Sequence, residues 1–145
     1  MQTKEFVEQL ENDRIVTAIG AAEKLTSGEI RVFITRKKVD DPVRTAQKQF
    51  HRMGMHKTQS RNGVLLFIAP ESQAFAIIGD QGIHEKCGQN FWALVAQAMV
   101  TNLREGKLTQ AVISGIEAAG AALQQHFPRR DDDINELPDE VEHDQ

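Results

Sequence analysis

The sequence has little of what several protein classes require. The 145-residue chain has a single cysteine, Cys87, so it cannot form an internal disulfide. Its longest uninterrupted apolar run, Val64 to Ala69, is far shorter than the roughly 20 residues that cross a bilayer. The N-terminal stretch MQTKEFVEQLENDR is charged throughout, which argues against a signal peptide. These absences predict a cytoplasmic protein without a membrane span.

The signatures of several large enzyme classes are also missing. The chain has no GxSxG nucleophile elbow, no phosphate-binding GxxxxGK[ST] loop and no GxGxxG dinucleotide turn. A metal-assisted hydrolase remains open, because a dication can polarise a phosphate and activate water without a nucleophilic side chain. The sequence therefore leaves enzymatic activity undecided and leans against it.

Charge is divided unevenly along the chain. Residues 128–145 hold eight acidic side chains and two arginines, whereas the rest of the chain holds 13 acids and 15 bases. Binding to nucleic acid needs a concentrated basic face, which this distribution does not predict. The acidic C-terminal segment instead favours a bound cation, or docking of the segment on the body of the protein.

The order of expected elements is that of an α/β protein. Strands are expected over residues 30–36, 63–69 and 74–79, and helices over 3–25, 42–54, 83–104 and 108–125. The first helix has a candidate break at Asn12-Asp13, and Asp41-Pro42 supplies an N-cap and a first helical residue. On the last helix, one apolar stripe faces the core, formed by Leu108, Val112, Ile116, Ala119 and Leu123.

The connectivity predicts which strand ends meet. A crossover through a helix makes strands 30–36 and 63–69 parallel, and the hairpin makes strand 74–79 antiparallel to its partner. Glu29, Asn62 and Asp80 are then expected at one edge of the sheet, beside Arg61 and His84. Taken singly, Glu29 is typical of a solvent-facing strand residue and Asp80 of a turn or helix cap. Only their expected convergence makes them candidates for function.

Several motifs carry a family resemblance. The segments TSGEIRVFI, RNGVLLFIA, FAIIGDQGIHEKCGQNFW and DINELPDEV, in this order, resemble the TPM domain family in its soluble, stand-alone branch. The resemblance implies a three-layer α/β/α sandwich around a small mixed sheet of about four strands. It also implies a divalent cation, with phosphatase activity ascribed to a plant branch and regulatory roles elsewhere. Residues 1–128 are expected to form one domain, on which the acidic segment 129–145 docks.

The acidic segment supplies candidate metal ligands. Composition alone favours a solvated acidic end, but the apolar Ile134, Leu137 and Val141 within it, and its match to the family, favour docking. Docked carboxylates would repel those of the sheet edge unless a cation lay between them. Calcium and magnesium take oxygen ligands. The predicted ligand set for Ca²⁺ or Mg²⁺, as one ion or a pair, is Glu29, Asp80, Asp133, Asn135, Glu136 and Asp139.

Two functional hypotheses follow from these residues. The first is a regulatory or interaction module, in which the ion orders the acidic segment and the ordered surface is recognised by a protein partner that the sequence does not name. The second is a metal-dependent phosphomonoester phosphatase, with Arg61 on the phosphate, Asn62 on the same edge and His84 as general acid. The regulatory hypothesis ranks first, because the chain offers many ligands for an ion and few groups for chemistry.

Overall fold

The computed structural model describes residues 10–129 and 141–143. Its helices are α2 (Asn12–Glu23), α3 (Pro42–Arg52), α4 (Gln81–Cys87), α5 (Gln89–Arg104) and α6 (Leu108–His126), with short 3₁₀ turns η1 (Met55–Lys57) and η2 (Pro70–Ser72). The strands are β1 (Glu29–Ile34), β2 (Gly63–Ala69), β3 (Ala74–Gly79) and β4 (Val141–His143). Among the described helices, none combines the length and apolarity needed to cross a bilayer.

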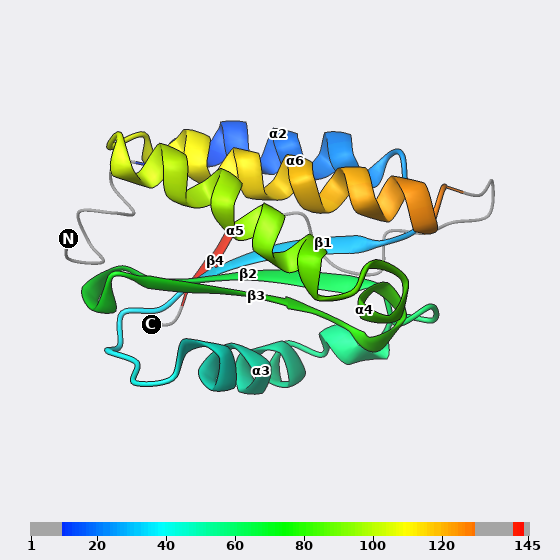
Figure 1. Cartoon of the computed structure of the whole chain (residues 1–145), viewed down its shortest axis with the longest axis horizontal. Helices are drawn as coiled ribbons and strands as arrows, with labels where there is room; N and C mark the ends of the chain where they lie inside the picture. Colours follow the sequence, from blue (N-terminus) through cyan, green and yellow to red (C-terminus); the bar gives the residue numbers. More distant parts are fainter. Residues whose placement is uncertain (1–9, 130–140, 144–145) are drawn as a thin grey trace.

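The strands form one mixed sheet in the order β3-β2-β1-β4. β1 runs parallel to β2, and β3 runs antiparallel to β2, as the connectivity predicted. The short β4 lies parallel to β1 on its other side, so three principal strands are joined by a three-residue fourth. Figure 1 shows α2, α5 and α6 on one face of the sheet and α3 on the other. The predicted three-layer α/β/α sandwich is therefore confirmed.

The central strands β1 and β2 are buried on both faces. On one face, Ile30 and Val64 belong to the large core under α2, α5 and α6. On the other, Phe33 and Phe67 stack in the smaller core that includes residues of α3. Alternate residues of β1 and β2 therefore serve the two cores in turn, as expected for strands covered on both sides. Glu29 is only 2% exposed, so its interpretation as a solvent-facing residue is wrong.

Two helix boundaries test the expectations from sequence. Asp41 caps α3 as predicted, because its Oδ1 accepts a hydrogen bond of 3.1 Å from the backbone N–H of Arg44. The single helix expected over 83–104 is instead two helices, α4 and α5, separated at Gly88. Gly88 has φ of +72° and ψ of −175°, an extended conformation with positive φ that glycine adopts without steric cost and that ends the first helix.

The last helix agrees closely with its expected range. α6 buries the whole predicted stripe of Leu108, Val112, Ile116, Ala119 and Leu123. After α6, Pro128 pairs with Thr26 in an isolated antiparallel bridge just before β1. The chain next described is β4, also beside β1. The predicted docking of the whole acidic segment involves residues 130–140, which lie outside the described residues, and it stays a prediction.

Candidate functional site

Three strand ends meet at one edge of the sheet, which we call the polar edge and define by Glu29, Arg61, Asn62, Asp80 and His84. Glu29 is in register with Gly63, and the backbone N–H of Asp80 donates to the carbonyl oxygen of Gly63 at 2.9 Å. The starts of β1 and β2 and the end of β3 therefore lie in one row. The backbone convergence predicted from connectivity is present, although the side chains at this edge are used in different ways.

Arg61 and Asp80 form a two-pronged ion pair. Arg61 donates from Nε to Oδ2 of Asp80 at 2.7 Å and from Nη2 to Oδ1 at 2.8 Å. This side-chain hydrogen bonding and the charge of Asp80 raise the pKa of Arg61 above its ordinary value. Asp80 is 6% exposed, whereas the Arg61 side chain is 45% exposed. The carboxylate is thus held by a charge-assisted pair whose outer side faces solvent.

Asp80 is also the N-cap of α4, the role that its position beside glycine suggested. Its Oδ1 accepts from the backbone N–H of Gln81 at 2.8 Å. The carbonyl oxygen of Arg61 accepts from the next two N–H groups of the helix, those of Gly82 at 2.8 Å and Ile83 at 3.3 Å. The first amides of α4 are therefore satisfied by the protein itself, so they do not form an anion site.

The backbone of Arg61 makes this arrangement possible. Arg61 has φ of +52°, a left-handed conformation that is uncommon for arginine and carries a conformational cost. Gly82 packs tightly against the same turn, because a Cβ on Gly82 would lie 2.2 Å from the carbonyl oxygen of Ser60. The backbone of this turn therefore packs directly against the backbone at the start of α4.

Asn62 holds the polar edge together from inside. It is 1% exposed, and its Nδ2 donates to Oγ of Ser27 at 3.3 Å. Its backbone N–H donates to Oγ1 of Thr58 at 3.3 Å, and its carbonyl oxygen accepts from the backbone N–H of Glu29 at 3.4 Å. These contacts join three segments of chain, so Asn62 has a structural role in positioning Glu29.

His84 is engaged by a tryptophan from α5. Trp92 Nε1 donates to Nδ1 of His84 at 2.8 Å, and the two rings stack with centroids 6.2 Å apart and planes 10° apart. Because Nδ1 accepts this hydrogen bond, a neutral His84 carries its proton on Nε2. The Nε2–H group could donate a hydrogen bond to a ligand. Trp92 fits over β3 because Gly79 has no side chain; a Cβ there would lie 1.9 Å from the indole. Trp92 was not among the site residues predicted from sequence.

Glu29 and Asp80 are separated by β2 at the polar edge, and the carboxylate of Asp80 is paired with Arg61. Neighbouring strands lie about 4.8 Å apart, so these two residues, separated by β2, have backbones roughly 10 Å apart. Met55 lies over Gly63 between them, with its carbonyl oxygen 3.2 Å from where a Cβ of Gly63 would be. No group of three or more His, Cys, Asp or Glu side chains suited to a metal ion is found within residues 10–129 and 141–143.

The remaining predicted ligands come from the acidic segment. Asp133, Asn135, Glu136 and Asp139 lie outside the described residues. The chain before residues 130–140 is fixed just before β1, and the chain after them pairs with the middle of β1. On one side, Arg129 donates its backbone N–H to the carbonyl oxygen of Leu25 at 3.2 Å. On the other, Val141 is in register with Val32.

A second buried carboxylate lies at this end of β1 and was missed from sequence. Glu23, at the end of α2, is 5% exposed, and its Oε2 accepts from the backbone N–H of Ile30 at 2.8 Å. Glu29 precedes Ile30 directly, so two buried acidic residues lie at the start of β1. Glu23 gave no separate signal in the sequence, because it sits in an ordinary helical pattern.

A cationic pocket of about 450 Å³ also borders the polar edge. Its lining residues include Arg44, Lys48 and His51, which follow one another at helical spacing on α3, together with Asp80. The chain has no acidic residue between positions 42 and 70. Few acidic residues close in sequence therefore balance the basic side chains of this pocket. The sequence analysis did not identify these basic residues as a group.

Comparisons with known proteins agree with this architecture. The model of the TPM domain matches residues 2–122. BA42, from the psychrophilic bacterium Bizionia argentinensis, is 40% identical; the match covers 92% of each chain with a TM-score of 0.86. The N-terminal domain of a P. gingivalis protein is 13% identical, over 79% of this chain and 76% of that one, with a TM-score of 0.60, a likeness of fold alone. Comparison with curated proteins gives no match. By its sequence and its fold, the chain belongs to the TPM domain family.

Proposed function

We propose that the protein is a regulatory or interaction module controlled by a divalent cation, most suitably Ca²⁺. The ion is held by oxygen ligands of Glu29, Asp133, Asn135, Glu136 and Asp139. Calcium accepts six to eight such ligands in a flexible geometry, which suits a segment contributing several carboxylates. The ordered segment then presents a surface to a protein partner.

The observation that carries the proposal is the position of the described chain on either side of residues 130–140. Residues 130–140 are joined to chain that contacts Leu25 on one side and Val32 on the other, and Glu29 lies between these two positions. Glu23 and Glu29 add two buried carboxylates to the same end of β1. The carboxylates of residues 130–140 would add further negative charge to this end of β1, and added negative charge favours a bound cation. Ion binding would therefore favour the ordered form, because that form brings the ligands together.

Asp80 has a different role in this proposal from the one expected. Its carboxylate is committed to Arg61 and to the start of α4. It could join a metal ion only by releasing Arg61. We therefore assign Asp80 to shaping the polar edge, and we place the ion on the β4 side of Glu29.

Calcium titration of the full chain tests the proposal. At a free ion concentration about 100 times Kd, the melting temperature should rise by roughly 5–10 °C. Glu29→Gln should abolish most of that rise, because it removes a charged ligand with little change of shape. Glu117→Gln, on the exposed side of α6, is the matched control and should keep the full response. An unchanged melting temperature with either Ca²⁺ or Mg²⁺ would reject the proposal.

The cationic pocket supports a second candidate, a metal-dependent phosphomonoesterase. Arg44 and Lys48 would bind the phosphate, and the exposed side of Arg61 would lie close by. A dication would polarise the phosphate and activate water. The test is hydrolysis of p-nitrophenyl phosphate with Mg²⁺, Mn²⁺ or Ca²⁺. Activity that falls at least tenfold in Lys48→Gln, but not in Lys24→Gln, would support it; no metal-dependent turnover would reject it.

A further inference from the structure

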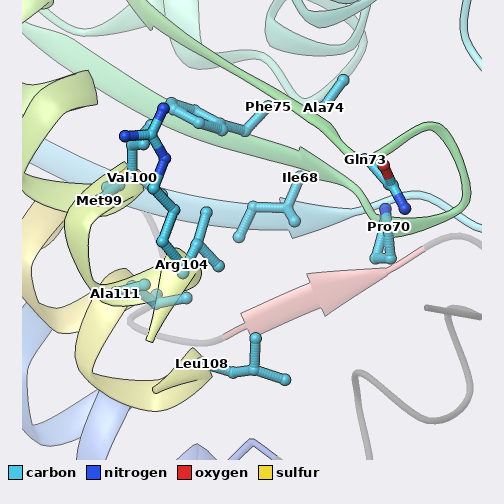
Figure 2. A pocket seen from close by; sticks show the side chains of 12 residues that line it. Ile68, Pro70, Gln73, Ala74, Phe75, Met99, Val100, Arg104, Leu108 and Ala111 are labelled. Atoms are coloured by element: carbon cyan, nitrogen blue, oxygen red, sulfur yellow. The ribbon is translucent and has the colours of Figure 1, made fainter. Parts of the chain in front are cut away.

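A large apolar pocket opens at the end of the sheet opposite the polar edge. Its volume is about 520 Å³, within the range of about 300–1,000 Å³ that is usual for sites of small molecules. It lies where β2 ends and β3 begins, under α5 and α6, and its lining includes Ile68, Phe75 and Leu103 (Figure 2). β2 has seven residues, so the pocket is roughly 20 Å from the polar edge.

The pocket has a fixed floor and an adaptable wall. Ile68, Ala111 and Val112 are buried in the floor and belong to well-packed strands and helices. Met99 forms part of the wall and fits against Gly115, where a Cβ would lie 2.8 Å from its Sδ. An unbranched methionine can change shape to fit different apolar partners. The pocket is therefore preformed at its base and adjustable at its side.

Arg104 is the one charged residue among those that line the pocket. In Figure 2 its side chain extends from α5 along the pocket toward Phe75. Within the described part of the chain, the Arg104 side chain is exposed and has no ion pair or hydrogen bond with another residue. Its guanidinium group carries several N–H donors in one plane and matches a carboxylate through two parallel hydrogen bonds.

We infer that this pocket binds a small amphipathic carboxylate, such as a medium-chain aliphatic acid, with its chain among Ile68, Phe75 and Leu103 and its carboxylate on Arg104. The apolar lining favours a hydrocarbon chain, because burying it removes apolar surface from water. The guanidinium selects an anionic head group over a neutral or cationic one. The polar edge takes no part in this binding, which is independent of the cation proposed above.

Titration of the ¹⁵N-labelled full chain with sodium decanoate, below its critical micelle concentration, tests the inference. Shifts in the ¹H–¹⁵N spectrum should centre on Ala74, Phe75, Val100, Leu103 and Arg104 and should saturate. Arg104→Gln should weaken decanoate binding about tenfold, the loss expected for a charge-assisted hydrogen-bonded pair of about 1.4 kcal/mol. Arg52 is exposed on α3, away from the pocket, and Arg52→Gln should bind decanoate as the wild type does.

Further ligands and variants separate the contribution of the hydrocarbon chain from that of the charge. 1-Decanol should bind the wild type and Arg104→Gln equally, whereas decyltrimethylammonium should bind the wild type weakly and Arg104→Gln more tightly. Ala111→Leu should fill the pocket and remove binding of decanoate and decanol alike. Glu29→Gln should leave decanoate binding unchanged, so failure of the cation proposal would not affect this result. Shifts scattered over the surface, or equal decanoate affinity in Arg104→Gln and wild type, would overturn the inference.

Discussion

The two ends of the sheet use their charged residues in opposite ways. At the polar edge, Arg61 is paired with Asp80, and the first amides of α4 are satisfied by neighbouring oxygens. At the other end, Arg104 extends over an apolar pocket. At the first end, Arg61, Asp80 and the start of α4 therefore stabilise and position the backbone, whereas at the second end Arg104 is exposed beside an apolar surface. A cluster of polar residues is thus a poor guide to a ligand site until the partners of each side chain are known.

The largest expected effect comes from disturbing the backbone fit at the polar edge. Gly82→Ala should destabilise the protein by about 3 kcal/mol, because its Cβ would lie 2.2 Å from a backbone oxygen that has little freedom to move. Gly106→Ala, between α5 and α6 near the apolar end, should cost only about 1 kcal/mol. Its φ is +75°, but nothing lies within 4 Å of the added carbon. Urea unfolding of both variants checks the contrast, and equal costs would contradict it.

The ion pair at the polar edge should have a smaller effect. Asp80→Asn keeps a good N-cap for α4 but removes the charge that Arg61 contacts. The melting temperature should fall by roughly 2–4 °C, a modest change because the outer side of the pair faces water and is screened. A double-mutant cycle with Arg61→Gln should show coupling between the two residues. Additive effects would mean that the observed geometry contributes little in solution.

Replacement of the tryptophan should have a smaller effect again. Trp92→Phe keeps an aromatic ring over Gly79 but loses the hydrogen bond to Nδ1 of His84. We expect a loss of about 0.5–1 kcal/mol, the usual net value of a neutral hydrogen bond. The ¹⁵N shifts of the imidazole should change from one predominant tautomer to a mixture. Unchanged shifts would show that Trp92 does not set the tautomer of His84.

The smallest expected effect concerns the lone cysteine, which bears on reactivity and not on stability. Burial raises the pKa of the Cys87 thiol above its ordinary value. Because the thiolate is the reactive form, less of it exists at pH 8 than in an unfolded chain, and alkylation by iodoacetamide should be slower. The folded protein should approach the rate of the urea-unfolded protein only as the pH rises through the raised pKa. Faster alkylation of the folded form at pH 8 would contradict this.

The sequence predicted the backbone of the polar edge better than its side chains. Strands 63–69 and 74–79 were identified because each is a short apolar run with turn residues on both sides. The break at Gly88 was missed, because a glycine within a helical pattern is often tolerated. The Arg61–Asp80 pair could not be foreseen, because it joins residues 19 positions apart and requires a left-handed Arg61. Spacing along the chain carries no record of such a conformation.

The apolar pocket was not foreseen for a related reason. Phe75, Met99 and Arg104 come from a strand and a helix that are far apart in sequence, and each alone fits an ordinary core or surface pattern. A hollow between packed elements depends on the exact volumes and rotamers of all its walls. Residue type and periodicity predict which side chains face inward, but not where they fail to fill the space.

The position of β4 has a consequence for synthesis of the protein. β1 lies in the interior of the sheet, yet one of its neighbours is made of residues 141–143, more than one hundred positions later. While the ribosome is still making the chain, the side of β1 that will receive β4 offers unpaired backbone groups to any other strand nearby. Completion of the sheet must therefore wait for translation to reach these residues, and a nascent chain paused before them is the form most exposed to mispairing.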